Sequence, residues 1–400
     1  MKKVLSFIFV FILFMVRANA VELDISSQNA ILYNMDTEEI LYEKAADEQV
    51  SIASLTKIMT ALVSIENIED LDTQVVLTAD DFGGLIEANA VTAGFTKGEV
   101  VTYRDLLYGL LLPSGADAAK ALARNIAGSE ENFIKMMNEK VEKMNLKNTH
   151  FSTVIGLDDD NNYSTARELA LIFKEALKNE DFKTIITTKE YTSSDGKVKF
   201  HSTIQSNAKK FEIDIPYILG GKTGTTTDAG LCLATIAKEN DVNYMLVTLG
   251  ALYDKKAPHN IEDAQTIYDY FIDNYGNHVI VDKETPFTEI KVKYGTEKTL
   301  KLYPTKNITK YLENDYDKND IKYVYDGREE ITAFTKKGEK LGTLQIYYQD
   351  NLIAKENIVL NQTLKFSLLE FAKENIIIIL SVITAVIIIV IFIFKRKKSK

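Results

Sequence analysis

The spacing of apolar residues changes twice along residues 21–278. Apolar and polar positions alternate on both sides of a polar turn at 36–38, which predicts two short strands. Apolar residues then recur at intervals of three and four positions, which predicts a series of helices. The predicted helices cover 55–67, 103–112, 116–128, 131–146 and 164–177.

Strand-like spacing returns from about Val198 onward. Two apolar runs, 231–238 and 243–252, flank a polar turn and predict a central hairpin, and 264–276 predicts a closing helix. Strands at both ends with helices between them indicate an α+β domain over 21–278, whose sheet joins its N- and C-terminal segments.

A different pattern begins at residue 279. Short alternating runs at 287–295, 298–303, 320–325 and 342–350 are separated by turns and predict a small all-β domain over 279–365. Residue types suited to catalysis do not concentrate in these runs. We therefore expect this domain to act as a spacer or a docking module.

The N-terminus reads as a secretory signal over residues 1–20. Lys2 and Lys3 precede an apolar run, and Ala18-Asn19-Ala20 offers a cleavage site of small residues, although Arg17 is unusual beside it. The alternative for this segment is an uncleaved N-terminal anchor.

The C-terminus predicts a transmembrane helix over 376–394, where Ser381 and Thr384 are the only polar residues. A basic tail follows at 395–400, and positive flanks stay in the cytoplasm. A buried core helix fits this terminal, basic context poorly. We thus expect a single-pass cell-membrane protein with the bulk of its chain outside the cytoplasm.

Composition narrows the function classes further. The formal net charge of −10 argues against a nucleic-acid partner. Cys232 is the only cysteine, so no internal disulfide forms, and its apolar surroundings predict a buried thiol. The four histidines show no paired spacing typical of zinc sites. We expect neither a metal nor an organic cofactor.

The most informative local pattern is Ser54-x-x-Lys57 at the start of the first predicted helix. Residues three apart on a helix are neighbours, and apolar surroundings would lower the pKa of Lys57 so that it accepts a proton from Ser54. The alternative is a solvated lysine. Ser194 with Lys197 and Ser206 with Lys209 share the spacing, but the former lies in a Gly-containing turn and the latter in a polar segment without apolar period.

Two further segments supply groups that a serine–lysine site needs. Ser114 lies in a turn between predicted helices, where it either relays protons or simply caps a helix. The segment 220–225 opens a predicted strand, and its glycines let a ligand approach the backbone closely. Lys222 there offers a positive charge, and the alternative is a Gly-rich hairpin with a solvated lysine. A phosphate-binding loop fails because Pro216 stands where a glycine is required.

Ser54-x-x-Lys57, Ser114-Gly115-Ala116 and Lys222-Thr223-Gly224, in this order, resemble the motifs of penicillin-binding proteins and serine β-lactamases. The stretches IASLTKIMTALV, LLPSGADAAKALA and GGKTGTTTDAGLCL resemble low-molecular-mass D-alanyl-D-alanine carboxypeptidases over residues 30–249. The resemblance implies a transpeptidase-like catalytic domain, in which a helical subdomain accompanies an antiparallel sheet.

The resemblance also implies roles for the residues. Ser54 would attack the D-Ala-D-Ala bond of a peptidoglycan stem peptide after Lys57 takes its proton, and Ser114 would pass the proton to the leaving D-alanine. Backbone N–H groups of Ser54 and Thr225 would form the oxyanion hole. Lys222, Thr223, Gly224 and Thr225 would bind the substrate and its carboxylate. β-Lactams would be covalent inhibitors.

Two departures from the family pattern stand out. Ala116 occupies the position where the family usually has an asparagine that helps to hold the substrate amide, and Thr153 replaces another frequent asparagine. A D,D-endopeptidase, a transpeptidase or a β-lactamase would use the same residues. A non-catalytic wall-binding protein is the alternative from another class, but it has no need of the intact Ser54, Lys57, Ser114 and Lys222.

Overall fold

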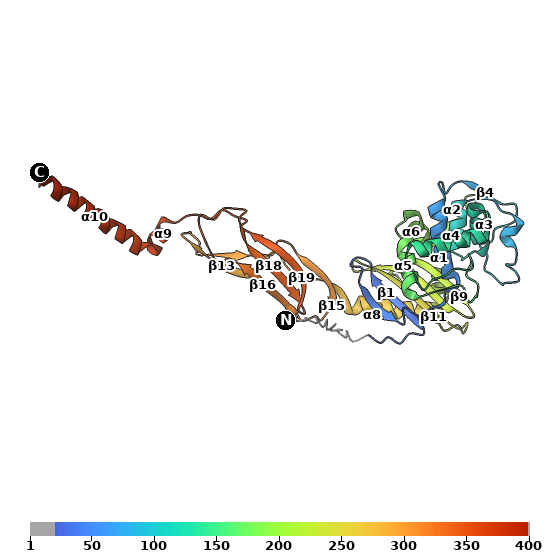
Figure 1. Cartoon of the computed structure of the whole chain (residues 1–400). Helices are drawn as coiled ribbons and strands as arrows, with labels where there is room; N and C mark the ends of the chain where they lie inside the picture. Colours follow the sequence, from blue (N-terminus) through green and yellow to red (C-terminus); the bar gives the residue numbers. More distant parts are fainter. Residues whose placement is uncertain (1–20, 399–400) are drawn as a thin grey trace, which may run out of the picture. The chain divides into compact units, whose positions relative to one another are not determined.

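The computed structural model describes residues 21–398, so the predicted signal segment lies outside the described residues. The chain divides into two compact units between Asp273 and Asn274. The first unit combines a five-stranded sheet with a helical subdomain, and strands dominate the second unit up to two C-terminal helices (Figure 1). The mixed α+β class predicted from the sequence is confirmed.

The sheet of the first unit is antiparallel and has the order β2-β1-β11-β10-β9. Its strands are β1 (Asn29–Asn34), β2 (Ile40–Lys44), β9 (Ile218–Thr226), β10 (Gly230–Glu239) and β11 (Val242–Ala251). The N-terminal β1 pairs with the distant β11, with Asn29 opposite Leu249. The predicted initial strands and the central hairpin are therefore correct.

Successive side chains of a strand point to opposite faces, and both faces of this sheet are covered. Helix α8 (His259–Asn274) packs on one face, where Tyr268 and Thr235 hydrogen-bond through their hydroxyls at 2.9 Å. Asp263 of α8 also accepts hydrogen bonds from the hydroxyl and backbone of Ser27, which precedes β1. Cys232 and Ala234 face the core shared with the helical subdomain.

The helical subdomain surrounds α1 (Thr56–Asn67), which is buried from Thr56 to Ile65. The other helices are α2 (Tyr103–Leu111), α3 (Ala116–Ala127), α4 (Glu130–Lys143), α5 (Ala166–Ala176) and α6 (Glu180–Thr187). Figure 1 shows α2, α3 and α4 grouped together, with α5 beside the sheet. Gly128 caps the C-terminus of α3 in a left-handed conformation at φ 80°, which glycine adopts without strain.

Three two-stranded ladders form within the segments that connect the main helices and strands of this unit. They pair β3 (Val50–Ser51) with β6 (Tyr163–Ser164), β4 (Gln74–Val76) with β5 (Val100–Thr102), and β7 (Glu190–Thr192) with β8 (Lys199–His201). Helix α7 (Thr203–Phe211) lies where we expected only strands, so that prediction was wrong. Helix α8 begins at His259, earlier than the predicted start at 264. The prediction was late because the first turn is mostly polar and gives little apolar period.

The second unit contains three small sheets around one apolar core. They are β12 (Tyr275–Val281) with β15 (Ile308–Glu313), β14 (Thr299–Leu302) with β13 (Thr288–Lys293) and β17 (Glu330–Thr332), and β16 (Ile321–Gly327) with β18 (Lys340–Tyr348) and β19 (Asn351–Val359). Leu344, Ile346 and Ile358 are among the buried residues that join these sheets.

Two helices end the described chain. Helix α9 (Leu368–Glu374) is followed after Asn375 by α10 (Ile376–Lys398). Residues Ile376–Arg396 of α10 form a helix that is long and apolar enough to cross a membrane, and the protein buries none of its most apolar stretch.

Candidate active site

Ser54 lies in a short 3-10 turn, Ala53–Leu55, that leads directly into α1. The preceding Ala53 has a φ of 47°, a left-handed conformation that residues with a side chain rarely adopt. Neighbouring segments hold this turn closely. A Cβ atom at Gly156 would lie 2.1 Å from the carbonyl oxygen of Ala53, and one at Gly224 of β9 would lie 3.1 Å from the Ala53 Cβ. Only glycine allows the approach at 156.

Lys57 lies one helical turn after Ser54 and is buried. Its Nζ donates hydrogen bonds to the Ser54 Oγ at 2.9 Å and to the carbonyl oxygen of Ile155 at 2.7 Å. Burial lowers the pKa of Lys57 to about 7, and the nearby Asp117 carboxylate only partly opposes this shift. A substantial fraction of Lys57 is therefore neutral near pH 7, in the form that accepts a proton.

Ser114 lies in the turn between α2 and α3, with a left-handed φ of 71°. It lines the same pocket as Ser54 and Lys57, together with Ala116 at the start of α3. The structure thus brings the three residues predicted to be catalytic around one cavity of about 260 Å³. Backbone strain at both Ala53 and Ser114 is typical of sites whose surroundings fix the chain for function.

Asp117 connects this pocket to the segment that forms its wall. Its Oδ1 accepts hydrogen bonds from the backbone N–H groups of Ala93 at 2.7 Å and Ala118 at 2.9 Å. The N–H of Ala116 donates to the carbonyl oxygen of Val91 at 2.8 Å. Burial raises the pKa of Asp117, and these backbone donors partly offset the rise. Asp117 was not singled out from the sequence.

The segment around Lys222 lies on β9, at an edge of the five-stranded sheet. Thr223, Gly224 and Thr225 line a second groove of about 410 Å³ that shares Ser54 and Ser114 with the first. Thr223 also hydrogen-bonds through its hydroxyl to that of Thr203 at 2.7 Å. Three of the four predicted substrate-binding residues therefore line a groove together with Ser54, and Lys222 does not.

Lys222 is fully buried and lines neither groove. Its Nζ donates to the carbonyl oxygen of Thr223 at 2.6 Å. Burial, reinforced by the nearby Lys57, holds the pKa of Lys222 well below its usual range. Lys222 therefore does not offer a ligand an exposed ammonium group.

Several lining residues had no sequence signal. The grooves are also lined by Asn89, Tyr253, Lys210 and Lys255. They come from loops and from the end of α7, and no motif marks them. Only the folded chain brings them to Ser54.

The other two Ser-x-x-Lys pairs lie in different surroundings. Lys197 forms an exposed ion pair of 2.7 Å with Asp195, and the Ser194 hydroxyl donates to Asp105 at 2.6 Å. Ser206 and Lys209 lie on α7, so the prediction that this segment lacks a helical period was wrong, but both side chains are exposed. Of the three pairs, Ser54 and Lys57 alone combine contact with burial.

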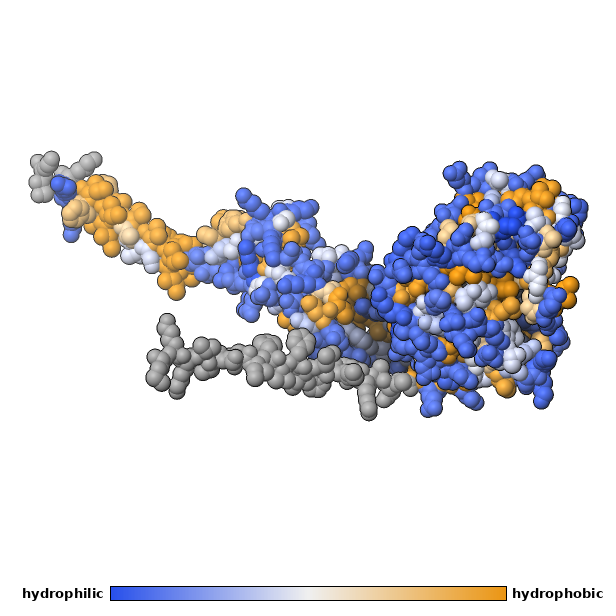
Figure 2. Space-filling view, turned by 45° about the vertical axis from the view of Figure 1, so that its right-hand side comes forward, coloured by the Kyte–Doolittle hydropathy of each residue, from blue (hydrophilic) through white to orange (hydrophobic). Residues whose placement is uncertain are grey.

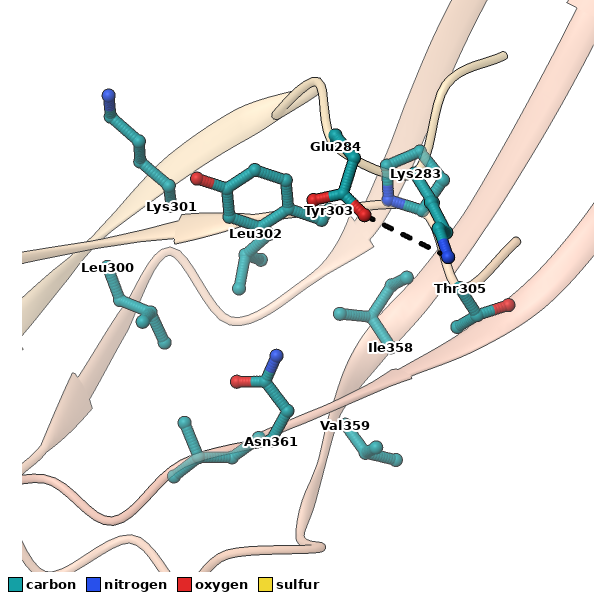
Figure 3. A pocket seen from close by; sticks show the side chains of 12 residues that line it. Lys283, Glu284, Leu300, Lys301, Leu302, Tyr303, Thr305, Ile358, Val359 and Asn361 are labelled. Carbon is teal, nitrogen blue, oxygen red and sulfur yellow. Dashed lines mark ion pairs between the residues drawn. The ribbon is translucent and has the colours of Figure 1, made fainter. Parts of the chain in front are cut away.

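The second unit contains a pocket of its own, of about 470 Å³ (Figure 3). Leu300, Leu302 and Ile358 provide apolar surface, and Lys283 pairs with the adjacent Glu284 at 3.9 Å. This lining pairs no nucleophile with a base. Within residues 21–398, no group of three or more His, Cys, Asp or Glu side chains is placed to hold a metal ion.

The chain matches two protein families. Residues 15–252 match the family described as D-alanyl-D-alanine carboxypeptidase, and residues 275–365 match the family described as penicillin-binding protein 5, C-terminal domain. D-alanyl-D-alanine carboxypeptidase DacF of Bacillus subtilis is 31% identical over 350 residues, which cover 86% of this chain and 87% of that protein.

Solved structures of related proteins are also similar to this chain. The crystal structure of the Streptomyces K15 DD-transpeptidase is 31% identical, with a TM-score of 0.56, and the match covers 63% of this chain and 98% of that one. Penicillin-binding protein 5 from Haemophilus influenzae is 24% identical and matches in fold, with a TM-score of 0.61 over 86% of this chain and 99% of that one.

Proposed function

The chain belongs to the D-alanyl-D-alanine carboxypeptidase family, and from this premise we propose how its residues release the terminal D-alanine of peptidoglycan stem peptides. The protein is a serine-type carboxypeptidase with the fold of penicillin-binding proteins. One observation carries the residue assignment. Ser54 accepts a hydrogen bond from a buried lysine whose pKa lies at about 7.

In the acylation step, neutral Lys57 takes the proton of the Ser54 hydroxyl, and Oγ attacks the carbonyl carbon between the two D-alanines. The backbone N–H groups of Ser54 and Thr225 stabilise the negative charge on the carbonyl oxygen. Lys57 then gives this proton to Ser114 as Ser114 passes its own hydroxyl proton to the leaving nitrogen, so D-alanine departs as a neutral amine and both Lys57 and Ser114 return to their starting forms. Water attacks the acyl-enzyme while neutral Lys57 takes one of its protons, and that proton passes to the Ser54 Oγ as the ester bond breaks and the shortened peptide leaves as an acid.

The free carboxylate of the substrate meets Thr223 and Thr225, whose side chains line the groove. Lys222 is buried out of open contact with the ligand, and its hydrogen bond to the Thr223 carbonyl oxygen helps to position the strand that carries both threonines. Lys210 and Lys255 add positive charge at the surface of the groove. A peptide that ends in a carboxylate is thereby favoured over one that ends in an amide.

The C-terminal helix α10 suggests a membrane anchor, and the family acts on the cell wall. We assign a single-pass topology in which α10 spans the cell membrane, the basic tail faces the cytoplasm and the catalytic unit lies outside. The sequence features 1–20 and 395–400 support this orientation, since a signal segment and a positive tail require the same arrangement.

Two assays on the purified full-length protein test this function. A fluorescent penicillin should label the protein covalently, and a peptide that ends in D-Ala-D-Ala should release free D-alanine. Label without D-alanine release would point to an acylating protein that does not turn over peptides. If the protein is not labelled and also releases no D-alanine, the result contradicts the proposal and favours a wall-binding protein.

A further inference from the structure

An exposed apolar patch lies in the second unit, directly before α10. It consists of Phe334, Phe366, Leu368 and Leu369, with exposed fractions of 62%, 44%, 73% and 64%. We call these four residues the juxtamembrane patch. Isolated exposed apolar residues are ordinary, but a group of this size beside a membrane-spanning sequence requires an explanation.

Ring contacts join the patch to the β-rich part of the unit. The rings of Phe334 and Phe366 lie 5.3 Å apart, and that of Phe371 lies 5.8 Å from Phe366. Tyr294, which follows β13, contacts both Phe334 and Phe371, at 6.2 and 5.0 Å. Four aromatic rings from three separate segments therefore form one cluster.

Backbone hydrogen bonds fix the same segment. The N–H of Ser367 donates to the carbonyl oxygen of Tyr294 at 2.8 Å, and the N–H of Thr296 donates to that of Lys365 at 2.9 Å. Ser367 then caps α9 by accepting from the N–H of Glu370. The segment before α10 is thus attached to the sheets and does not form a free linker.

The chain itself indicates what covers the patch. Helix α9 ends at Glu374 and α10 begins at Ile376 (Figure 2 shows apolar side chains covering α10). At 1.5 Å per residue, Leu368 lies within about 12 Å along the chain of the start of α10. The polar interface of a bilayer is roughly 5 to 8 Å thick on each side of the hydrocarbon, which is less than this distance. The patch therefore reaches the interface when α9 lies along the bilayer surface, and the break between α9 and α10 at Asn375 permits this.

The chemistry of the patch fits the same surface. Aromatic rings are enriched at the boundary between headgroups and hydrocarbon. Lys336, Lys337 and Lys365 are exposed beside Phe334 and Phe366 in the sequence, where they would meet lipid phosphates while their stems cover apolar surface. Apolar rings flanked by lysines are the features expected of a surface that inserts into the interface of an anionic membrane.

We propose that the juxtamembrane patch inserts into the membrane interface, so that the second unit is held on the lipid surface at Phe334 and Phe366 as well as through α10. The occupant is the lipid bilayer. This inference rests on the proposed anchorage by α10, and the experiment below distinguishes failure of one from failure of the other.

The chain contains no tryptophan, so one introduced tryptophan reports its own surroundings. The full-length Phe334→Trp variant is placed in vesicles of phosphatidylcholine and phosphatidylglycerol, with or without bromine on the upper acyl chain. The proposal expects that brominated lipid reduces the emission to about half, because the ring lies at the acyl boundary. Leu369→Trp repeats the measurement at a position outside the ring cluster, in case Phe334→Trp disturbs the packing.

Two matched variants complete the design. Leu352→Trp places the reporter on an equally exposed apolar residue at the far end of β19, seven residues from Val359, and should not be quenched. Phe392→Trp lies within α10 and should be quenched if α10 spans the bilayer. Quenching at Phe392 but not at 334 or 369 overturns the patch proposal alone. No quenching at Phe392 overturns the anchor, and the patch with it.

Discussion

Lys57 donates a 2.9 Å hydrogen bond to Ser54 while its ammonium group is buried beneath the surface of the groove. Burial disfavours the charged form of the amine, so the hydrogen bond joins a nucleophile to a base that is ready to accept its proton. The Ser54–Lys57 pair leads directly to predictions about the nucleophile and about the pH dependence of the rate.

Replacing the nucleophile should abolish the chemistry while leaving the fold intact. Ser54→Ala should lose covalent penicillin labelling and reduce D-alanine release by roughly 10⁴-fold or more, because no other group forms the acyl-enzyme. Ser194→Ala and Ser206→Ala are matched controls with the same spacing to a lysine, and both should retain label and activity. A penicillin adduct mapped to another serine by mass spectrometry would refute the assignment.

The rate should follow the titration of Lys57. The neutral amine is the active form, so kcat/KM should fall about tenfold per pH unit below the pKa of about 7 and level off above it. Lys57→Arg keeps the charge at every pH and should be inactive. An acid limb that appears only near pH 10 would contradict a buried, neutral base.

Asp117 offers a check on the sign of this pH dependence. Its carboxylate raises the pKa of Lys57, so Asp117→Asn should move the acid limb of the pH profile to lower pH. Asp105→Asn removes another buried carboxylate, one that contacts Ser194 and Thr102, and should leave the limb in place. A shift to higher pH for Asp117→Asn would contradict the proposed electrostatics.

Ala116 stands beside Ser54 and Lys57 in the pocket but offers no side-chain amide. Ala116→Asn should raise kcat/KM two- to tenfold, since one hydrogen bond to a polar substrate group contributes roughly 0.5 to 1.5 kcal/mol. Ala116→Leu introduces the same number of side-chain heavy atoms in the same branched shape without an amide, and should not gain activity. If both variants lose activity alike, the pocket lacks room, and a small residue at 116 belongs to a self-consistent arrangement of this enzyme.

Gly156 should tolerate no side chain without a large loss of stability. Its φ of 77° and the Ala53 carbonyl oxygen, 2.1 Å from an added Cβ, combine strain with a clash against backbone. Gly196 has a φ of 75° but no atoms within 4 Å of an added Cβ. Gly156→Ala should therefore lower the free energy of unfolding by at least about 2 kcal/mol more than Gly196→Ala does. Equal losses in thermal or urea unfolding would mean that the loop moves freely away from Ala53.

Deleting residues 376–400 should release a soluble protein that still cleaves a short peptide. The protein buries none of the most apolar stretch of α10, so its removal leaves the catalytic unit intact. Activity on the peptide should match that of the full chain in detergent. A truncated protein that folds but no longer cleaves the peptide would show that α10 does more than anchor.

Segments with long apolar runs were predictable, and short segments with few apolar residues were not. The buried helix α1 and the hairpin of β10 and β11 have long apolar runs, and the spacing within each run indicates a helix in the first case and strands in the second. Helices α6 and α7 are short, carry few buried residues and depend on packing against β9, which no local pattern records. Strands β12, β15 and β17 were missed because they pair with distant segments. Strand β19 was also missed, although it forms a hairpin with the preceding β18.

In the candidate site, the sequence indicated side chains but not backbone groups. Ser54 and Lys57 were identifiable because helical spacing makes them neighbours. The Ile155 carbonyl that accepts from Lys57 has no side-chain signature, and the Asp117 contact with Ala93 spans two elements. The burial of Lys222 was also unpredicted, because a lysine among glycines resembles an exposed hairpin.

The pairing of β1 with β11 has a kinetic consequence. Ser26 and Asp263, which hydrogen-bond beside this pairing, are 237 residues apart in the chain. Contacts of such long range require a large loop to close before they contribute stability, and folding slows accordingly. As the chain emerges from the ribosome or a translocation channel, β1 can pair only with β2. The edge of β1 that later pairs with β11 stays open until β11 has been synthesised or translocated. A chaperone that covers such edges would protect β1 from aggregation until β11 arrives.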